Sequence, residues 1–232
     1  MHGLTEGELL MVAKNTGETN LFNNIYISLK QDILWLRLKP RTILTEMSLA
    51  EIYKTSKTPI REALAKLIND GLIKVLPRKG YMVTEISCSD VKNLFEYRWV
   101  LENANLCLAM NRATTDQLKK LEKLADKLEV YTDENPKFST FIKSNNDFHL
   151  YLAQITDNVI MLEQLSRTIE NLQRIMWISA TEDLVSTSIC EHIKFVEYIR
   201  NKDLGGAQTL MKKHIDDVLD IGLSNMSNSL IL

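Results

Sequence analysis

The apolar and polar positions that follow residue 47 predict two short helices and then two short strands. The second helix has apolar residues at intervals of three and four, the spacing of a helix that buries one face. These residues are Ile60, Ala63, Leu64, Leu67 and Ile68. Pro59 stands in the first turn of this helix, where a missing N–H is harmless, and Gly71 supplies a left-handed cap. The residues after Gly71 alternate as two strands around a basic turn.

This arrangement is a winged helix-turn-helix, and its polar residues suit contact with DNA. The first residues of a recognition helix reach phosphates and base edges in the major groove. The candidates for contact are Ser56, Lys57, Thr58 and Arg61 on the helix, and Arg78, Lys79 and Gly80 at the wing. Arg61, one turn into the helix, suits a forked bond to a guanine edge. The alternative interpretation is a solvated basic turn between packed helices.

The rest of the pattern is almost entirely helical. An amphipathic helix is expected over residues 21–38, and a short strand at 42–44 is expected to pair with the wing. After a linker at 84–89, about six helices are expected. The first is expected from a cap at Ser87 or Ser89 to about 112, and a polar loop or short helix start is expected at 181–188. The other five are expected from 114 or 115 through 128, from 133 to about 155, from 159 to about 178, from 189 to 200 and from 203 to about 222.

The expected fold class is therefore mainly α, with an N-terminal winged helix-turn-helix followed by an all-α bundle. The expected domains are a mobile arm at 1–20, a DNA-binding domain at 21–85 and a helical domain at 86–232. A bundle of roughly 140 residues is long enough to bury a core of its own.

Composition and charge narrow the class of protein. The net charge of the 232 residues is −2, but residues 21–85 hold 11 Lys/Arg against 6 Asp/Glu, whereas residues 86–232 hold 16 against 21. A basic module beside an acidic one is typical of a protein that presents one end to a polyanion. There is no apolar run of about 18 residues and no secretory signal, so no membrane span is expected. Three scattered cysteines suit a reducing cytoplasm.

The recognition segment resembles the DNA-binding domain of the GntR family of bacterial transcription regulators. Residues 58–64 read T-P-I-R-E-A-L, close to the family's T-P-V-R-E-A-L, and an L-x-x-x-G-L-I pattern and a basic wing ending in glycine follow. Lys57 stands where Arg is usual, which keeps the charge but loses a bidentate fork. Met47 stands where many members have a DNA-contacting Arg, and Lys54 and Arg41 replace usual glycines. These departures bear on the operator sequence rather than on the fold.

Three of the four histidines are expected on the inner faces of bundle helices. They are His149, which shares its face with Asn145, and His192 and His214 on later helices. Bundle interiors build metal sites from side chains on facing helices. Neutral imidazoles suit Zn, Ni, Cu and Fe, and the Asn145 amide oxygen is a weaker fourth ligand. The alternative is that each histidine is a core residue bonded to a backbone carbonyl, and spacing alone does not show that the three converge.

Residues 86–232 resemble the FCD-type ligand-binding domain of the FadR subfamily of GntR regulators. The resemblance lies in E-Y-R-W-V-L-E at 96–102, N-N-D-F-H at 145–149, and the histidine motifs that contain His192 and His214. It implies a dimerising domain in which Asn145 and the three histidines bind a divalent metal of the Zn, Ni or Fe type, with a small carboxylate effector beside it. Asn145 replaces the Asp found in many members, which removes a negative charge and should weaken the metal site.

Arg98 is expected to point into the bundle, with Glu102 one turn further along the same helix. A buried guanidinium needs an acidic partner. That partner is either Glu102, or another carboxylate of the chain, or an incoming carboxylate effector held bidentately. The resemblance favours the effector.

Three functions follow from these patterns. The first is a ligand-responsive transcription regulator, most simply a repressor, whose homodimer places two recognition helices in successive major grooves. The second is a three-histidine metalloenzyme with an accessory nucleic-acid module. Asp147 and Glu191 are expected off the inner face, so no acid or base accompanies the metal and an enzyme is not expected. The third is a structural helical dimer with its histidines satisfied in the core.

Overall fold

The computed structural model describes residues 18–126 and 137–228. These residues fall into two compact units, 18–86 and 87–228. The mobile arm expected at 1–20 lies outside the described residues, except for its last three residues, which belong to a helix.

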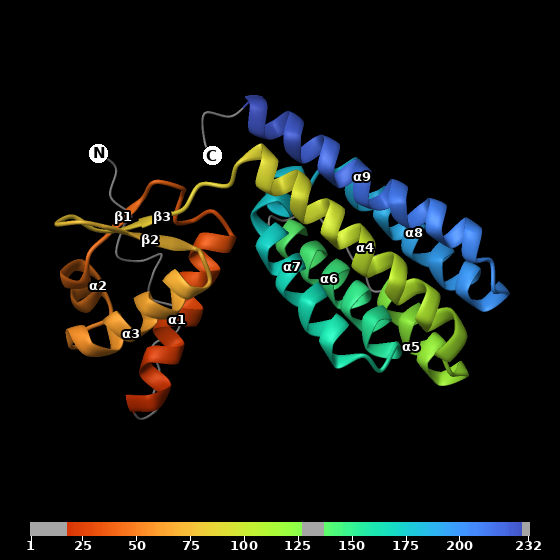
Figure 1. The fold of residues 1–232 in the computed structure, drawn as a ribbon, viewed down its shortest axis with the longest axis horizontal. Helices are drawn as coiled ribbons and strands as arrows, with labels where there is room; N and C mark the ends of the chain where they lie inside the picture. The colour runs from red at the N-terminus through yellow and green to blue at the C-terminus, as the bar shows by residue number, and fades with distance from the viewer. Residues whose placement is uncertain (1–17, 127–136, 229–232) are drawn as a thin grey trace. The chain divides into compact units, whose positions relative to one another are not determined.

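The N-terminal unit packs three helices against a small antiparallel sheet (Figure 1). In chain order its elements are α1 (Glu18–Leu34), β1 (Ile43–Leu44), α2 (Glu46–Ile52), α3 (Lys57–Asn69), β2 (Ile73–Leu76) and β3 (Gly80–Val83). Strand β3 lies between the other two and pairs Tyr81 with Leu44 and Gly80 with Leu76. The predicted winged helix-turn-helix is confirmed. Helix α1 ends four residues earlier than expected, and Leu36 just beyond it has a left-handed φ of 56°.

The core of this unit is formed by the apolar positions that recur along α1 and α3. Six of these side chains are at most 1% exposed: Ile25, Leu29, Ile33, Ile60, Leu64 and Leu67. They join one cluster with the inner residues of the sheet. Helix α2 begins at Thr45, whose hydroxyl accepts from the backbone N–H of Ser48. The apolar face of α3 is therefore fixed in the core, and its polar face is left exposed.

A three-residue polar contact ties α1 to the C-terminal end of α3. The Tyr26 hydroxyl donates to Asp70 Oδ2 at 2.5 Å, and Lys30 Nζ donates to the same oxygen at 3.0 Å. Burial of Asp70 opposes ionisation, but the hydrogen bonds from Tyr26 and Lys30 outweigh it and lower the pKa of the carboxyl. The ionised form of Asp70 is therefore the one that holds the two helices together.

The stabilising contribution of Asp70 is expected to disappear in acid. A carboxyl whose folded pKa is depressed stabilises the fold above its unfolded pKa, which is about 3.9, and loses this effect as pH falls through the folded pKa. We expect Asp70→Asn to lower the free energy of unfolding by about 1 kcal/mol or less near pH 6, because the group is partly exposed. Urea unfolding followed by circular dichroism at pH 6 and pH 3 measures this, and the difference from wild type should shrink at the lower pH.

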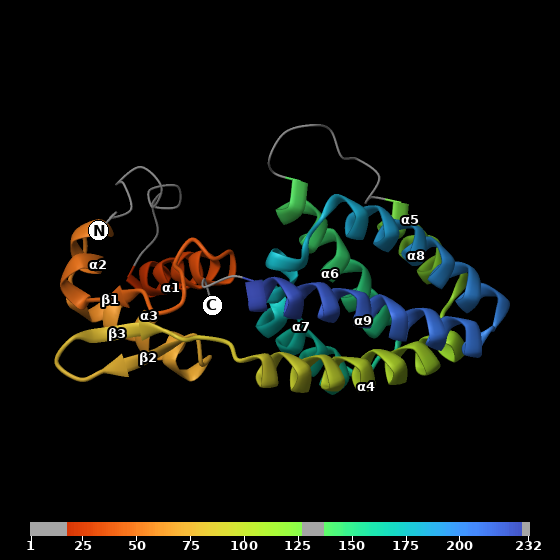
Figure 2. The ribbon, with the colours of Figure 1, turned by 90° about the horizontal axis from the view of Figure 1, so that it is seen from above.

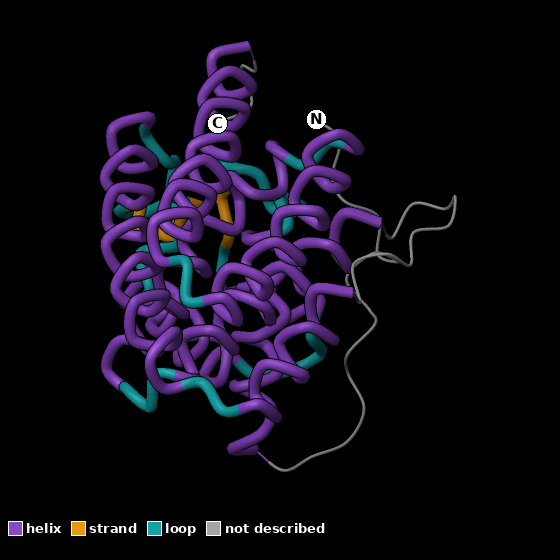
Figure 3. The backbone as a smooth tube through the Cα atoms, turned by 90° about the vertical axis from the view of Figure 1, so that its right-hand side faces the viewer, coloured by secondary structure: helices purple, strands orange, loops and turns teal. Residues whose placement is uncertain are grey.

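The C-terminal unit is a bundle of helices, as predicted, and the described residues contain six of them. They are α4 (Cys88–Arg112), α5 (Thr115–Asp126), α6 (Lys137–Ile155), α7 (Val159–Ser179), α8 (Glu182–Asn201) and α9 (Leu204–Asn228). Helices α4 and α9 lie side by side (Figures 1 and 2), and α9 also packs against α7 and α8. Figure 3 draws the helices in purple and the short strands of the N-terminal unit in orange. Each of α4, α6, α8 and α9 thus turns one face toward a common interior.

One open alternative is decided by the structure, and one expected helix limit was wrong. Of the polar loop and the helix start expected as alternatives at 181–188, the structure has the helix start: these residues are the first part of α8, because Thr181 caps the helix and the apolar residues Leu184 and Val185 are buried. Helix α9 continues to Asn228 rather than ending near 222. The helix start expected at 133 falls in the part of the chain that is not described. No helix within the described ranges is long and apolar enough to cross a membrane.

Candidate functional site

The N-terminal half of α3 presents the polar residues that the sequence analysis selected for DNA contact. Ser56 precedes the helix, and Lys57, Thr58 and Arg61 lie in its first turns, all four exposed. The Ser56 side chain makes no capping hydrogen bond and the residue is exposed. The backbone N–H groups of a helix start also attract phosphate. These residues form one surface that suits a nucleic-acid backbone.

Arg61 has a partner that the sequence analysis did not anticipate. Its Nε lies 2.8 Å from Glu46 Oε2, while the Tyr81 hydroxyl donates to Glu46 Oε1 at 3.2 Å. The Arg61 side chain remains 63% exposed. Because the ion pair engages Nε, it steers the guanidinium without covering the two Nη nitrogens that form a fork to guanine. Glu46 was missed because it is distant in sequence from Arg61 and lies on a different helix.

The wing residues divide into exposed cations and a structural glycine. Arg78 and Lys79 are exposed in the turn between β2 and β3. Gly80 is half-buried and has φ of 111°, and a Cβ placed on it would lie only 2.4 Å from the Leu44 carbonyl oxygen. The geometry therefore gives Gly80 a role in shaping the wing, whereas the two cations are exposed at its turn.

The structure brings the three predicted histidines together in the interior of the C-terminal unit. His149 comes from α6, His192 from α8 and His214 from α9, and each is at most 1% exposed. A set of their ring nitrogens, one from each residue, lies within 4.8 Å of one another. The Nε2 atoms of His149 and His214 are 3.2 Å apart. The His192 ring stacks on Phe148, with centroids 4.0 Å apart and planes inclined by 9°.

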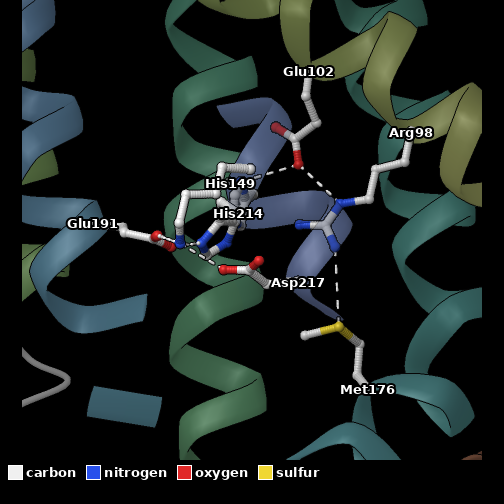
Figure 4. Close-up of polar contacts among 8 residues, drawn as sticks. Arg98, Glu102, His149, Met176, Glu191, His214 and Asp217 are labelled. Carbon is white, nitrogen blue, oxygen red and sulfur yellow. Dashed lines mark hydrogen bonds and ion pairs between the residues drawn. The ribbon is translucent and has the colours of Figure 1, made fainter. Parts of the chain in front are cut away.

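Two carboxylates contact this cluster, and one of them corrects an expectation. Glu102 Oε1 lies 2.9 Å from His149 Nδ1, and Glu191 Oε2 lies 2.8 Å from His214 Nδ1 (Figure 4). Both carboxylates are buried. The expectation that Glu191 points away from the inner face is wrong, because α8 packs against both α5 and α9 and so has more than one buried side. Asp147 is exposed, as expected.

The electrostatics of the cluster favour neutral rings at His149 and His192 beside ionised carboxylates. Burial lowers the pKa of His149 to about 4, although Glu102 favours the charged ring. Burial also lowers the pKa of His192 well below its ordinary value. Burial alone would raise the pKa of Glu102, but the nearby His149 and Arg98 outweigh it and lower it. Neutral imidazole nitrogens beside negative charge are the form in which histidine binds metals.

Several buried polar atoms near the cluster have no hydrogen-bond partner among the described residues. They include both ring nitrogens of His192 and both side-chain amide atoms of Asn145, which lies one turn before His149 on α6. Both side-chain amide atoms of Asn105 on α4, which the sequence analysis did not select, also lack a hydrogen-bond partner among the described residues. Buried polar groups are rarely left unpaired, and each such group needs an explanation. A missing ion or ligand is the explanation that accounts for several of them at once.

Arg98 is buried and only partly paired. Its Nε donates to Glu102 Oε1 at 3.1 Å, and Nη1 lies 3.9 Å from the sulfur of Met176 (Figure 4). Nη2 has no partner in the part of the chain that is described. The i+4 carboxylate expected as one alternative is therefore present, and it pairs with Nε but not with Nη2.

The comparisons with known proteins agree with this architecture. A model of the FCD domain matches residues 93–217, and a model of bacterial regulatory proteins of the gntR family matches residues 21–83. The HTH-type transcriptional repressor RspR of Escherichia coli is 30% identical over 194 residues, covering 84% of this chain and 80% of RspR. The HTH-type transcriptional regulator YdhC of Bacillus subtilis is 26% identical over 199 residues, covering 85% and 89%. The solved structure of Escherichia coli McbR/YncC matches 93% of this chain and 100% of that one, with a TM-score of 0.71 at 21% identity.

Proposed function

Because this chain is a DNA-binding transcription regulator that belongs to the GntR family of bacterial regulatory proteins and carries an FCD domain, we propose that it is a homodimeric repressor controlled by a small carboxylate. The carboxylate is held beside a divalent metal in the helical unit. The observation that carries this proposal is the buried cluster of three imidazoles close to a half-paired Arg98. Repression is proposed by analogy with RspR, which is named a transcriptional repressor. The relatives are regulators, so nothing favours the metalloenzyme alternative.

The residues present fit a divalent metal. His149, His192, His214 and Asn145 would hold it, and the unpaired nitrogens of His192 and the unpaired amide of Asn145 are the groups that a metal would satisfy. Three nitrogens and one neutral oxygen suit Zn, Ni or Fe better than Mg or Ca. When bound, the metal supplies a positive charge that attracts a carboxylate oxygen. Asn145 brings no negative charge, so the site is expected to be weaker than one with an aspartate.

Arg98 is the proposed anchor for the carboxylate effector. Its unpaired Nη2 is buried and close enough to the cluster for Glu102 to contact both Arg98 and His149. A guanidinium binds a carboxylate with charge-assisted hydrogen bonds. Helix α4, which carries Arg98, follows the DNA-binding unit directly in the chain. A ligand that prefers one position of α4 shifts the population of arrangements in which two recognition helices match successive major grooves.

The DNA-binding part of the proposal is tested by Arg61→Ala. We expect affinity for an operator, selected from random DNA, to fall about tenfold to a hundredfold, because a forked arginine–guanine contact contributes about 1–3 kcal/mol. A gel-shift titration at one fixed salt concentration measures the change. Arg200→Ala is the matched control, since Arg200 is also an exposed arginine in an ion pair, but lies in the helical unit. Equal operator affinity for wild type and Arg61→Ala would count strongly against this reading of α3.

A further inference from the structure

Two buried carboxylates contact the histidine cluster from different helices. Glu102 on α4 lies against Nδ1 of His149, and Glu191 on α8 lies against Nδ1 of His214. Figure 4 shows them on either side of the two imidazoles. In both rings the contact uses Nδ1, and the Nε2 atoms are the ones that approach each other to 3.2 Å. Glu191 makes a hydrogen bond to its ring, whereas Glu102 lies close to Nδ1 of His149 without hydrogen-bond geometry.

This arrangement determines which nitrogen of each ring is available to a metal. An ionised carboxylate only accepts hydrogen bonds, so Nδ1 of His214 donates to Glu191, and the nearby Glu102 oxygen favours a proton on Nδ1 of His149. In the neutral form of each ring, Nε2 then carries a lone pair. Two lone pairs 3.2 Å apart repel each other, unless a cation or a proton on one of them lies between. The carboxylates therefore direct both histidines toward one shared positive charge.

Each carboxylate also accepts a hydrogen bond from a cationic side chain. Glu102 Oε1 also accepts from Arg98 Nε at 3.1 Å. Glu191 uses its other oxygen, Oε1, to accept from Lys213 Nζ at 2.8 Å, and Lys213 also contacts Asp217 Oδ2 at 2.6 Å. Glu191 is therefore held through both of its oxygens, whereas Glu102 receives both contacts on Oε1 and its Oε2 has no partner among the described residues. A carboxylate held through both oxygens keeps an imidazole in one orientation, so the orienting role is supported more strongly for Glu191.

A purely structural role for the two acids explains less of the geometry. Ion pairs that only joined helices would not need to meet the same nitrogen in two different rings. His192 offers an internal comparison, because neither of its nitrogens has a partner among the described residues and its ring is positioned by stacking on Phe148. Stacking fixes the plane of a ring but leaves its protonated nitrogen undecided. Only the carboxylates select Nε2.

We infer that Glu102 and Glu191 are positioning residues, which hold His149 and His214 by Nδ1 so that both rings present Nε2 to one divalent cation. The inference rests on the metal site proposed above and adds the residues that orient its ligands. Carboxylates behind metal-binding histidines fix the tautomer and raise the basicity of the ligand, and their loss typically lowers metal affinity about 10- to 100-fold.

The decisive experiment compares Glu191→Gln and Glu102→Gln with wild type in the full-length protein. Zn²⁺ affinity is measured by competition with a chromophoric chelator, and long-range ¹H–¹⁵N correlation spectra report which nitrogen of each histidine carries the proton. We expect each substitution to weaken Zn²⁺ binding about 10- to 100-fold. In the Zn²⁺-loaded wild type, His149 and His214 should both keep the proton on Nδ1. Glu191→Gln should remove this preference at His214 alone.

Matched controls separate orientation from general damage to the fold. Glu197→Gln on α8 and Glu96→Gln on α4 make the same substitution at exposed positions of the same helices, and should leave Zn²⁺ affinity unchanged. Glu102→Gln also leaves Arg98 without its carboxylate and could unfold the protein. In that case Glu191→Gln is the decisive variant. Unchanged affinity and unchanged tautomers in Glu191→Gln, with Zn²⁺ still lost in His192→Ala, would overturn the inference and leave the metal site standing. Absence of Zn²⁺ binding in wild type would instead overturn the metal site itself.

Discussion

Replacing His192 with alanine is expected to lower affinity for a divalent metal by about a hundredfold to a thousandfold. A four-ligand zinc site contributes roughly 10–16 kcal/mol in apparent binding free energy, so one ligand accounts for about 3–4 kcal/mol. His192 is the most informative of the three rings, because both of its nitrogens lack a partner among the described residues. Its removal therefore breaks no hydrogen bond that would complicate the result. Native mass spectrometry, compared with the denatured mass, should show a metal-bearing dimer for wild type and a metal-free one for His192→Ala.

The control for this prediction reproduces the loss of packing without removing a ligand. Phe141→Leu takes away a buried phenyl ring on α6, the helix of His149, but leaves all three imidazoles and the Phe148 ring that stacks on His192 in place. Its metal affinity should stay within a few-fold of wild type, even though a smaller core side chain lowers stability. If wild type bound no metal, and His192→Ala folded and bound DNA normally, the histidines would be core residues of a structural dimer.

The histidine cluster shows which buried side chains of a helical bundle can be predicted from sequence. The spacing of apolar residues placed His149, His192 and His214 on inner faces, because helical periodicity fixes direction within a single helix. Glu191 was misplaced by the same reasoning, which assumed one buried face per helix. Helix α8 has neighbours on two sides, α5 and α9, so a residue about 100° from His192 is also buried. Whether a residue such as Glu191 is buried depends on which helices pack together, and the spacing of apolar residues in one sequence does not show this.

Two residues that depart from the GntR pattern have left-handed backbone conformations. Arg41 and Lys54 stand where glycine is usual, and both have left-handed φ values, 67° and 50°. The fold has therefore kept the conformation that glycine supplies most easily, at a cost of about 1–2 kcal/mol for a residue with a Cβ. The Arg41 side chain forms a two-point ion pair with Glu85, at 2.9 and 3.0 Å, on the exposed surface. The sequence identified both unusual residues but not the ion-pair partner of Arg41.

Gly80→Ala is expected to destabilise the N-terminal unit by about 2–4 kcal/mol and to weaken operator binding with it. Two separate effects add up at this position. A φ of 111° is strained for any residue with a Cβ, which costs about 1–3 kcal/mol. The new Cβ would also lie 2.4 Å from the Leu44 carbonyl oxygen, which is backbone and cannot rotate away. Relieving the clash requires β1 and β3 to separate, and this displaces Arg78 and Lys79 at the wing tip.

Gly71→Ala isolates the strain from the clash, since Gly71 also has positive φ, 72°, but a Cβ there meets nothing within 4 Å. It should cost only about 1 kcal/mol, the usual penalty for a left-handed alanine. Urea unfolding of both full-length variants measures the difference, and gel shift shows whether the wing still contributes to binding. A Gly80→Ala protein that loses no more stability than Gly71→Ala would mean that β1 moves freely. The wing would then be positioned by its DNA contacts, not by pairing between β1 and β3.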